Sequence, residues 1–143
     1  MGCETDNQYC NCLYYSANAL ARIITKMAEE EFAVVQLAPS YAFLLMAVNG
    51  KPGIQPMEIS KIMMLTPSTV TRLIEKMEFK GYLERKIIGK FTEVHPTKKS
   101  ISINGDIKKA WQNLLTHYER VLGKDESKKL TTEIFEAALK LQE

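Results

Sequence analysis

The sequence predicts a mainly α-helical fold with a single small β-hairpin. Apolar residues recur at three-and-four spacing over most of the 143 residues, which is typical of amphipathic helices. This pattern stops between residues 82 and 96, where the turn Gly89-Lys90 separates two short runs rich in β-branched and aromatic residues. The composition, 45% hydrophobic and 25% charged, is that of an ordinary globular protein. We therefore expect one domain over residues 1–143.

Two helices are expected in the first third of the chain. Apolar residues at helical spacing predict the first, from about Asn7 to Glu31; they are Leu13, Ala17, Leu20, Ile24 and Met27. Pro39 stands at a typical first helical position and opens a second, very apolar helix through Val48. The segment 49–53 holds two glycines and a proline, so it ends that helix.

Two shorter helices follow, separated by a tight turn at Met63-Met64-Leu65. The first runs from Pro56 to about Ile62 and the second from Pro67 to Lys80, with Thr66 as N-cap and Gly81 just past the end. Two helices joined by a turn of three or four residues form a helix-turn-helix unit. In DNA-binding proteins the second helix of this unit enters the major groove.

A hairpin and two more helices complete the predicted order. Residues 83–88 and 91–95 read as strands, so the hairpin is a wing beside the helix-turn-helix unit. A helix follows that Asn104-Gly105 either starts or weakens, and a last helix spans about 125–141. The predicted fold is thus a winged helix-turn-helix with a DNA-binding lobe at 38–99, flanked by a helical region at 7–37 and 100–143.

The second helix of the helix-turn-helix unit offers a polar outer face. Val70, Leu73, Ile74 and Met77 form an inward stripe, so at about 100° per residue Ser68 and Arg72 point away from the core. Small hydroxyl side chains allow close approach to phosphates, and Arg can contact guanine with two hydrogen bonds. The candidate DNA contacts, including two in the wing, are Ser68, Thr69, Thr71, Arg72, Lys76, Lys86 and Lys90.

Charge is concentrated in the same central part of the chain. The net charge is +2, but residues 61–99 hold nine basic and four acidic residues, whereas residues 1–60 hold three and six. A local excess of cations is what phosphate binding requires. The alternative is a solvated face, on which Arg72 and Lys76 merely pair with Glu75 or Glu78.

Other classes of function find little support in the sequence. Signatures of zinc proteases, serine hydrolases, P-loops and dinucleotide-binding folds are absent, so we expect neither an enzyme nor a bound cofactor. Cys3, Cys10 and Cys12 lack the spacing of a metal site and are expected to be reduced thiols. The longest apolar run, 41–48, is too short to span a bilayer, and we expect a cytoplasmic protein without membrane contact.

The run from Ser68 to Arg85, STVTRLIEKMEFKGYLER, closely resembles the core of MarR-family regulators. The resemblance implies a homodimer in which the first and last two helices of each copy interlock. It also implies binding of double-stranded DNA at a pseudo-palindromic operator, commonly as a repressor. The wing departs from the family, which usually has Asp-x-Arg where this chain has Gly89-Lys90-Phe91. Lys90 can contact a phosphate there but cannot replace an Arg fork.

A narrower likeness lies near the N-terminus. Cys10-Asn11-Cys12-Leu13-Tyr14 resembles the Cys-x-x-Leu-Tyr of the OhrR-like organic-peroxide sensors in the same family, and Pro39-Ser40-Tyr41 resembles their Pro-x-Tyr. This likeness implies that Cys10 senses peroxide with Tyr14 and Tyr41 as supports. The alternative is that the cysteines are small buried or idle residues, which is the commoner role of free Cys.

Two functions remain open on the sequence. The first is a sequence-specific transcriptional regulator, released from DNA by a small-molecule or oxidative signal. The second is a winged helix that binds another protein and not DNA, because fold does not fix function and this wing is poor in Arg. The operator, the target genes and the effector cannot be read from the sequence.

Overall fold

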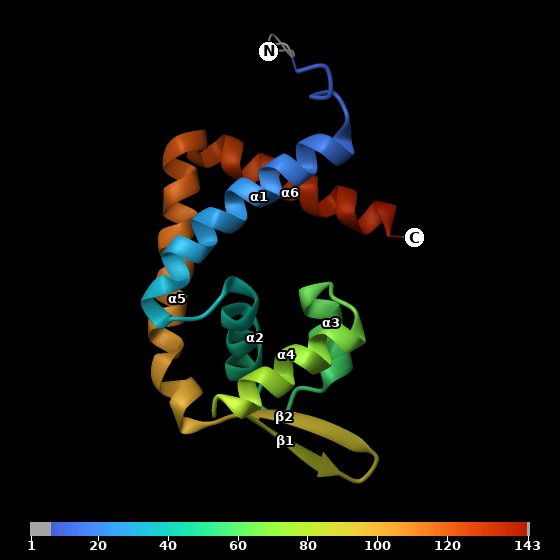
Figure 1. Cartoon of the computed structure of the whole chain (residues 1–143), viewed down its shortest axis with the longest axis vertical. Coiled ribbons are helices and arrows are strands. Elements are labelled where there is room, and N and C mark those ends of the chain that lie inside the picture. Colours follow the sequence, from blue (N-terminus) through green and yellow to red (C-terminus); the bar gives the residue numbers. More distant parts are fainter. Residues whose placement is uncertain (1–6, 143) are drawn as a thin grey trace.

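A computed structural model describes residues 7–142 and confirms the predicted fold class, with the elements in the expected order (Figure 1). The elements are α1 (Leu13–Phe32), the 3-10 turn η1 (Ala33–Val35), α2 (Pro39–Gly50), α3 (Pro56–Met63), α4 (Pro67–Phe79), β1 (Leu83–Ile88), β2 (Phe91–Pro96), α5 (Lys98–Leu122) and α6 (Lys124–Leu141). The antiparallel strands β1 and β2 form the wing, residues 83–96.

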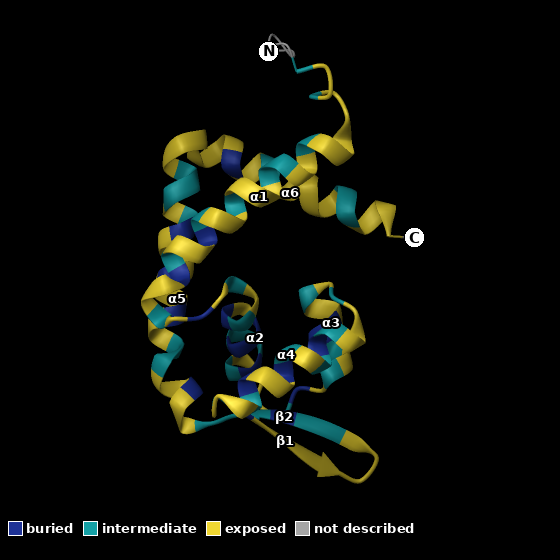
Figure 2. Cartoon of the chain, in the orientation of Figure 1, coloured by how far each residue is buried: buried dark blue, intermediate teal, exposed yellow. Residues whose placement is uncertain are grey.

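The elements α2 to β2 pack into one lobe, residues 38–99. Helix α2 lies at its centre and contacts α3, α4 and β2, because its apolar side chains face all of them. Leu44, Leu45 and Val48 of α2 are fully buried, as are Ile74 and Met77 of α4. Figure 2 shows this burial as dark segments on the inner sides of the helices, with exposed residues outside.

Helix α5 joins this lobe to the rest of the chain. Its first half contacts α2 and β2, and its second half contacts α1 and α6, which folds back from its end (Figure 1). Three aromatic rings meet where α1, α2 and α5 converge. Phe43 lies between Phe32 and Trp111, with ring centroids 5.9 and 6.1 Å apart. Both pairs are edge-on, a geometry that stabilises aromatic pairs beyond the contribution of their buried surface.

Polar side chains also cross from α2 to α5. The amide Nδ2 of Asn49 donates to the Oγ of Ser100 at 3.1 Å and to the Oδ1 of Asn104 at 3.2 Å, and the Ser100 hydroxyl in turn lies 3.3 Å from Asn49 Oδ1. Ser100 is fully buried. A buried hydroxyl needs a hydrogen-bond partner, so this cluster fixes the angle at which α5 leaves the lobe.

One helix begins later than predicted, and a second begins where the sequence left two possibilities open. Helix α1 starts at Leu13, not near Asn7, because residues 8–11 form turns. Helix α5 starts at Lys98 and runs through Gly105, because the Thr97 side chain caps it by accepting from the Ser100 backbone N–H. A glycine inside a helix costs about 1 kcal/mol, which packing along a helix of 25 residues offsets.

The structure adds one pairing that the sequence prediction missed. Ile54 forms an antiparallel bridge to Val94 of β2, with Val94 N–H donating to Ile54 O and Gly53 N–H donating to Val94 O, each at 2.9 Å. The bridge attaches the wing to the segment between α2 and α3. Within residues 7–142, no single helix is long and apolar enough to cross a membrane; α1 with η1 and α2 reaches that apolarity only as a pair bent by 62°.

Candidate nucleic-acid interface

The turn between α3 and α4 is set by backbone geometry. Met64 adopts a left-handed conformation with φ 54°, which directs the chain sharply out of α3. The Leu65 N–H donates to the Ser60 carbonyl at 3.1 Å, and the buried Ser60 hydroxyl donates back to the Leu65 carbonyl. A three-residue turn therefore forms at residues 64–66, one residue later than predicted, and it holds the start of α4 against α3.

Helix α4 is fixed at both ends and along one side. The Thr66 hydroxyl caps its N-terminus by accepting from the Thr69 N–H at 3.3 Å, as predicted, and Pro67 occupies the first turn. Past its end, the left-handed Gly81 lets the Tyr82 N–H donate to the Met77 carbonyl at 2.9 Å. The inner stripe is buried against the core, with Leu73 half-buried at its edge.

The outward face of α4 carries the predicted hydroxyls and cations. Ser68, Arg72 and Lys76 are exposed, and Thr69 is half-buried beside them. The Arg72 guanidinium lies 3.4 Å from the Thr69 hydroxyl, a weak hydrogen bond that orients it along the helix. Thr71 differs from the others, because its hydroxyl donates to the Pro67 carbonyl at 3.0 Å and its side chain is half-buried.

The acidic residues of α4 do not neutralise this face. Glu78 pairs with Arg85 of β1 at 2.8 Å, across the junction of helix and wing. In the part of the chain that the structure describes, no carboxylate lies within ion-pair distance of Arg72 or Lys76. The alternative interpretation, in which Glu75 or Glu78 absorbs these cations, therefore finds no ion pair to support it.

The wing is a regular hairpin, and its two predicted DNA-contacting lysines differ in whether an acidic residue lies nearby. Its two strands align in six consecutive residue pairs, from Leu83 with Pro96 at the base to Ile88 with Phe91 at the turn. Lys86 lies 3.7 Å from Glu84 on the same face, a loose surface ion pair. Lys90 is exposed in the turn itself. Of the two predicted wing contacts, Lys90 is the better placed for a phosphate.

Sequence reasoning missed two side chains that hold the interface in shape. Arg85 joins the wing to α4 through Glu78, and Lys99 of α5 donates to the Lys80 carbonyl at 2.8 Å while lying 4.4 Å from the centre of the Tyr82 ring. Both are cations, and the sequence showed them only as part of the local positive charge. Their partners lie on other elements, so no spacing along the chain reveals the contacts.

The cysteine region lies apart from α4, at the N-terminal end of α1 (Figure 1). Cys10 is disulfide-bonded, so the expectation of a reduced thiol is wrong for Cys10 in this structure, whereas Cys12 is free and exposed; Cys3 lies outside the described residues. Tyr14 is exposed on α1, and Tyr41 packs against the lobe core on α2. Cys10 and Tyr14 thus lie together at the start of α1, whereas Tyr41 lies on α2 in the lobe.

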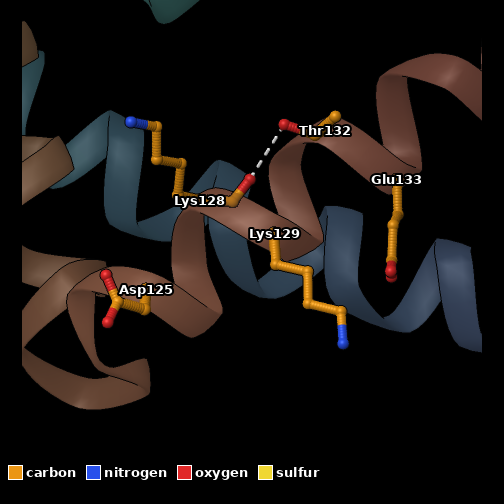
Figure 3. A pocket seen from close by; sticks show the side chains of 5 residues that line it. All are labelled: Asp125, Lys128, Lys129, Thr132 and Glu133. Atoms are coloured by element: carbon orange, nitrogen blue, oxygen red, sulfur yellow. Dashed lines mark hydrogen bonds between the residues drawn. The ribbon is translucent and has the colours of Figure 1, made fainter.

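Hollows on the surface are shallow and open to solvent. Figure 3 shows one on α6, where Asp125, Lys128, Lys129, Thr132 and Glu133 project from a single helix. The Thr132 hydroxyl there donates to the Lys128 carbonyl at 3.1 Å, so it serves its own helix. Another hollow lies between α1 and α5 and includes Glu31 and His117, whose nearest N and O atoms are 3.8 Å apart. Among residues 7–142 no group of three or more metal-ligating side chains comes together.

Comparison with known proteins agrees with this geometry. Residues 35–88 match a family model described as "MarR family". Solved structures that superpose over nearly the whole chain include the transcriptional repressor CouR bound to p-coumaroyl-CoA, with a TM-score of 0.83, 18% identity and coverage of 94% of this chain and 97% of that one. A mutant E. coli MarR in complex with operator DNA superposes with a TM-score of 0.80 at 15% identity, covering 92% of this chain and 98% of that one. The S. aureus MepR-DNA complex superposes with a TM-score of 0.78 at 14% identity, covering 90% of this chain and 97% of that one. No curated protein sequence matches the chain significantly.

Proposed function

We infer the function from two premises: the chain has the fold of the MarR-family transcriptional regulators, and residues 35–88 match that family's model. We propose that it is a cytoplasmic, non-enzymatic regulator that binds double-stranded DNA as a homodimer. The observation that carries the proposal is the outer face of α4, where Ser68, Arg72 and Lys76 are exposed and the cations have no acidic partner among the described residues.

The proposed contacts divide by chemistry. Arg72 reads a base edge, since its planar fork can hydrogen-bond guanine O6 and N7 together. Ser68, Thr69 and Lys76 contact phosphates, which sets the position of the helix without reading sequence. Thr71 contributes through its methyl group, because its hydroxyl already bonds the Pro67 carbonyl.

A dimer gives this interface its spacing. Two copies related by a two-fold axis place two α4 helices about 34 Å apart, in successive major grooves of a pseudo-palindromic operator. We propose that binding represses transcription and that an effector releases the dimer by changing this spacing, so that only one spacing fits DNA. Two of the similar structures hold DNA and one holds a coenzyme A thioester, which is the pattern expected of a ligand-controlled repressor.

The first experiment selects duplexes that purified protein retains from a random-sequence pool and measures the affinity of Arg72→Ala for the selected duplex. Loss of one two-pronged base contact weakens binding about 5- to 150-fold, the equivalent of about 1–3 kcal/mol. Lys108→Ala is the matched control, because it removes an exposed cation from α5, outside the lobe. We expect this control to bind like the parent protein.

The salt dependence separates DNA binding from the rival function. Log affinity should fall linearly with log salt, with a slope set by the number of phosphates contacted. Failure to retain any duplex, or equal binding by Arg72→Ala and the parent, contradicts the regulator and favours a winged helix that binds protein.

A peroxide signal is a separate proposal about the effector. A cellular thiol first opens the disulfide of Cys10 by exchange and is itself oxidised to a disulfide. The Cys10 thiolate released in this way attacks an organic hydroperoxide, cleaving its O–O bond to give a cysteine sulfenate and an alcohol, and Tyr14 and Tyr41 support that sulfenate. Since the two tyrosines lie on different helices of one chain, the dimer is expected to bring Tyr41 of one copy toward Cys10 of the other. Release of DNA by hydroperoxide that persists unchanged in Cys10→Ser contradicts this proposal and leaves the DNA-binding proposal intact.

A further inference from the structure

The end of the wing is apolar on both faces. Ile87, Ile88 and Phe91 are 81%, 53% and 59% exposed, although the base of the same hairpin is buried at Leu83 and Val94. We call residues 87–91 the wing tip. Ile88 and Phe91 form the last pair of the two strands and share one face, while Ile87 pairs with Thr92 on the other.

Hairpin stability does not account for the whole tip. A β-branched residue opposite an aromatic one stabilises an antiparallel pair, which explains Ile88 with Phe91. Ile87 gains no such partner, since Thr92 faces it, yet it is the most exposed of the three. Apolar side chains at the end of a projecting hairpin indicate a surface that another molecule covers.

The charges around the tip indicate what covers it. Lys90 is exposed in the turn between Ile88 and Phe91, and no acidic residue occurs within 87–91. Lys86, just before the tip, lies 3.7 Å from Glu84 and opposite Glu93, so it adds little free charge. The tip thus combines an apolar end with one cation, Lys90, at its edge. A minor groove offers the complement, because phosphates line its rim while its walls are apolar deoxyribose and its floor is the edge of the base stack.

The wing is also held in register with α4. Glu78 of α4 pairs with Arg85 of β1 at 2.8 Å, and the Tyr82 N–H at the start of the wing donates to the Met77 carbonyl at 2.9 Å. These contacts join the wing rigidly to the helix proposed to lie in the major groove. The base of the wing is therefore held at a fixed angle to α4, and in Figure 1 the hairpin leaves the C-terminal end of that helix and runs back below it.

We propose that Ile88 and Phe91 enter the minor groove beside the major groove occupied by α4, as an apolar wedge in place of an arginine fork. Apolar wedges of this kind pack against sugars and partly unstack a base step. Lys90 holds the flanking phosphate, and Ile87 covers the opposite wall. The inference rests on the proposed function, because it specifies how the same interface ends.

An apolar wedge has a thermodynamic signature that a cationic wing lacks. Replacing a phosphate-bound Lys lowers the slope of log affinity against log salt by about 0.9, because one fewer counterion is released. Removal of an apolar side chain weakens binding without changing that slope. The salt series therefore distinguishes a wedge from an ionic contact by a second readout besides affinity.

The experiment measures affinity and salt slope for three variants on the duplex selected by the parent protein. They are a double variant that carries both Ile88→Thr and Phe91→Thr, the single variant Lys90→Ala, and the control Val34→Thr. Threonine keeps strand preference, and Val34 is an exposed apolar residue of η1, outside the lobe. We expect the double variant to bind about tenfold more weakly or worse with an unchanged salt slope. Lys90→Ala should lower the slope, and Val34→Thr should change neither quantity. A 2-aminopurine at the flanking step should brighten with the parent protein and not with the double variant.

The outcomes separate this inference from the proposed function. Normal DNA binding by the parent together with unchanged affinity of the double variant overturns the wedge and leaves the regulator standing. The same holds if the double variant keeps its affinity for DNA but loses self-association in sedimentation, because the tip then covers another copy of the chain. Retention of no duplex by the parent overturns both.

Discussion

The lobe and the three helices α1, α5 and α6 bury their apolar residues very differently. In the lobe most large apolar side chains of α2 and α4 face one shared core, and the outer face of α4 is polar except for Phe79 at its end, which is 90% exposed. The other helices leave many large apolar side chains exposed, namely Leu13, Ile23, Trp111, Val121, Leu122, Ile134, Phe135, Leu139 and Leu141. Only Ser127 is buried among the described residues of α6. One chain therefore closes the core of the lobe, although the wing tip and Phe79 stay exposed, and it leaves α6 almost without buried residues.

This difference indicates two different kinds of partner. A surface of hydroxyls and cations suits a hydrated polyanion, whereas an extended apolar surface suits another apolar surface. A second copy of the same chain can supply that surface, since a two-fold axis packs a patch of one copy against the same patch of the other. The comparison thus supports the proposal that the lobe binds DNA and that α1, α5 and α6 mediate self-association.

The largest expected effect is on the apolar helices. The double variant Ile134→Glu with Phe135→Glu places charges on the exposed apolar side of α6, so it should be monomeric. Loss of two-site binding should weaken DNA binding on the order of 100-fold or more. Sedimentation gives the oligomeric state and a gel-shift titration gives the affinity.

Thr132→Glu serves as the control for charge on α6. It adds a carboxylate at an exposed polar position and should remain dimeric. A fully dimeric Ile134→Glu, Phe135→Glu protein would show that α6 is not the dimer surface, and the contrast between the two regions would need another explanation.

Thermal unfolding sharpens the same contrast. Leu45→Ala leaves a cavity in the closed core of the lobe and should destabilise the protein by about 2–5 kcal/mol. Its decrease in Tm should not depend on protein concentration. Leu139→Ala on α6 should lower Tm more at low concentration than at high, because dimer and fold are linked by mass action. Equal behaviour of the two variants across a concentration series would contradict the division.

A smaller effect is expected where the two regions join. Asn49→Ala removes the partner of the buried Ser100 hydroxyl and should cost about 1–3 kcal/mol in the free energy of unfolding. Asn113→Ala, at an exposed position of α5, should cost little. Urea unfolding compares them. A stability loss for Asn49→Ala no larger than for Asn113→Ala would show that the polar cluster does not hold α5 to the lobe.

The sequence predicted the parts of the fold that local signals define. Thr66, Pro67 and Gly81 are a cap, a first-turn proline and a left-handed end for α4, all readable within a few residues. The start of α5 stayed open because Gly105 could either start the helix or weaken it, whereas Thr97 is the actual cap. The bridge from Ile54 to Val94 escaped prediction because a single pair far apart in sequence leaves no periodic pattern.

In the candidate interface, too, features set by local sequence could be predicted and contacts between elements could not. Helical periodicity predicted correctly that Ser68 and Arg72 face outward, since direction depends only on position along α4. It could not predict that Glu78 is engaged with Arg85, because that pair crosses from helix to strand. Nor could it show that Ile87 remains exposed, since an apolar residue in a strand is ordinarily expected to be buried.

The smallest expected effect is at the ion pair between α4 and the wing. Glu78→Gln removes a pair whose side chains are 27% and 35% exposed, so the loss in stability should be below about 1 kcal/mol. The wing nevertheless loses a restraint on its angle to α4, while Arg85 gains freedom as a cation. If the wing acts as a fixed continuation of α4, affinity for the selected duplex should fall although the net positive charge has increased by one. If charge alone governs binding, affinity should rise, and the parallel variant Glu75→Gln, whose carboxylate has no ion pair in the described chain, gives that rise as a reference.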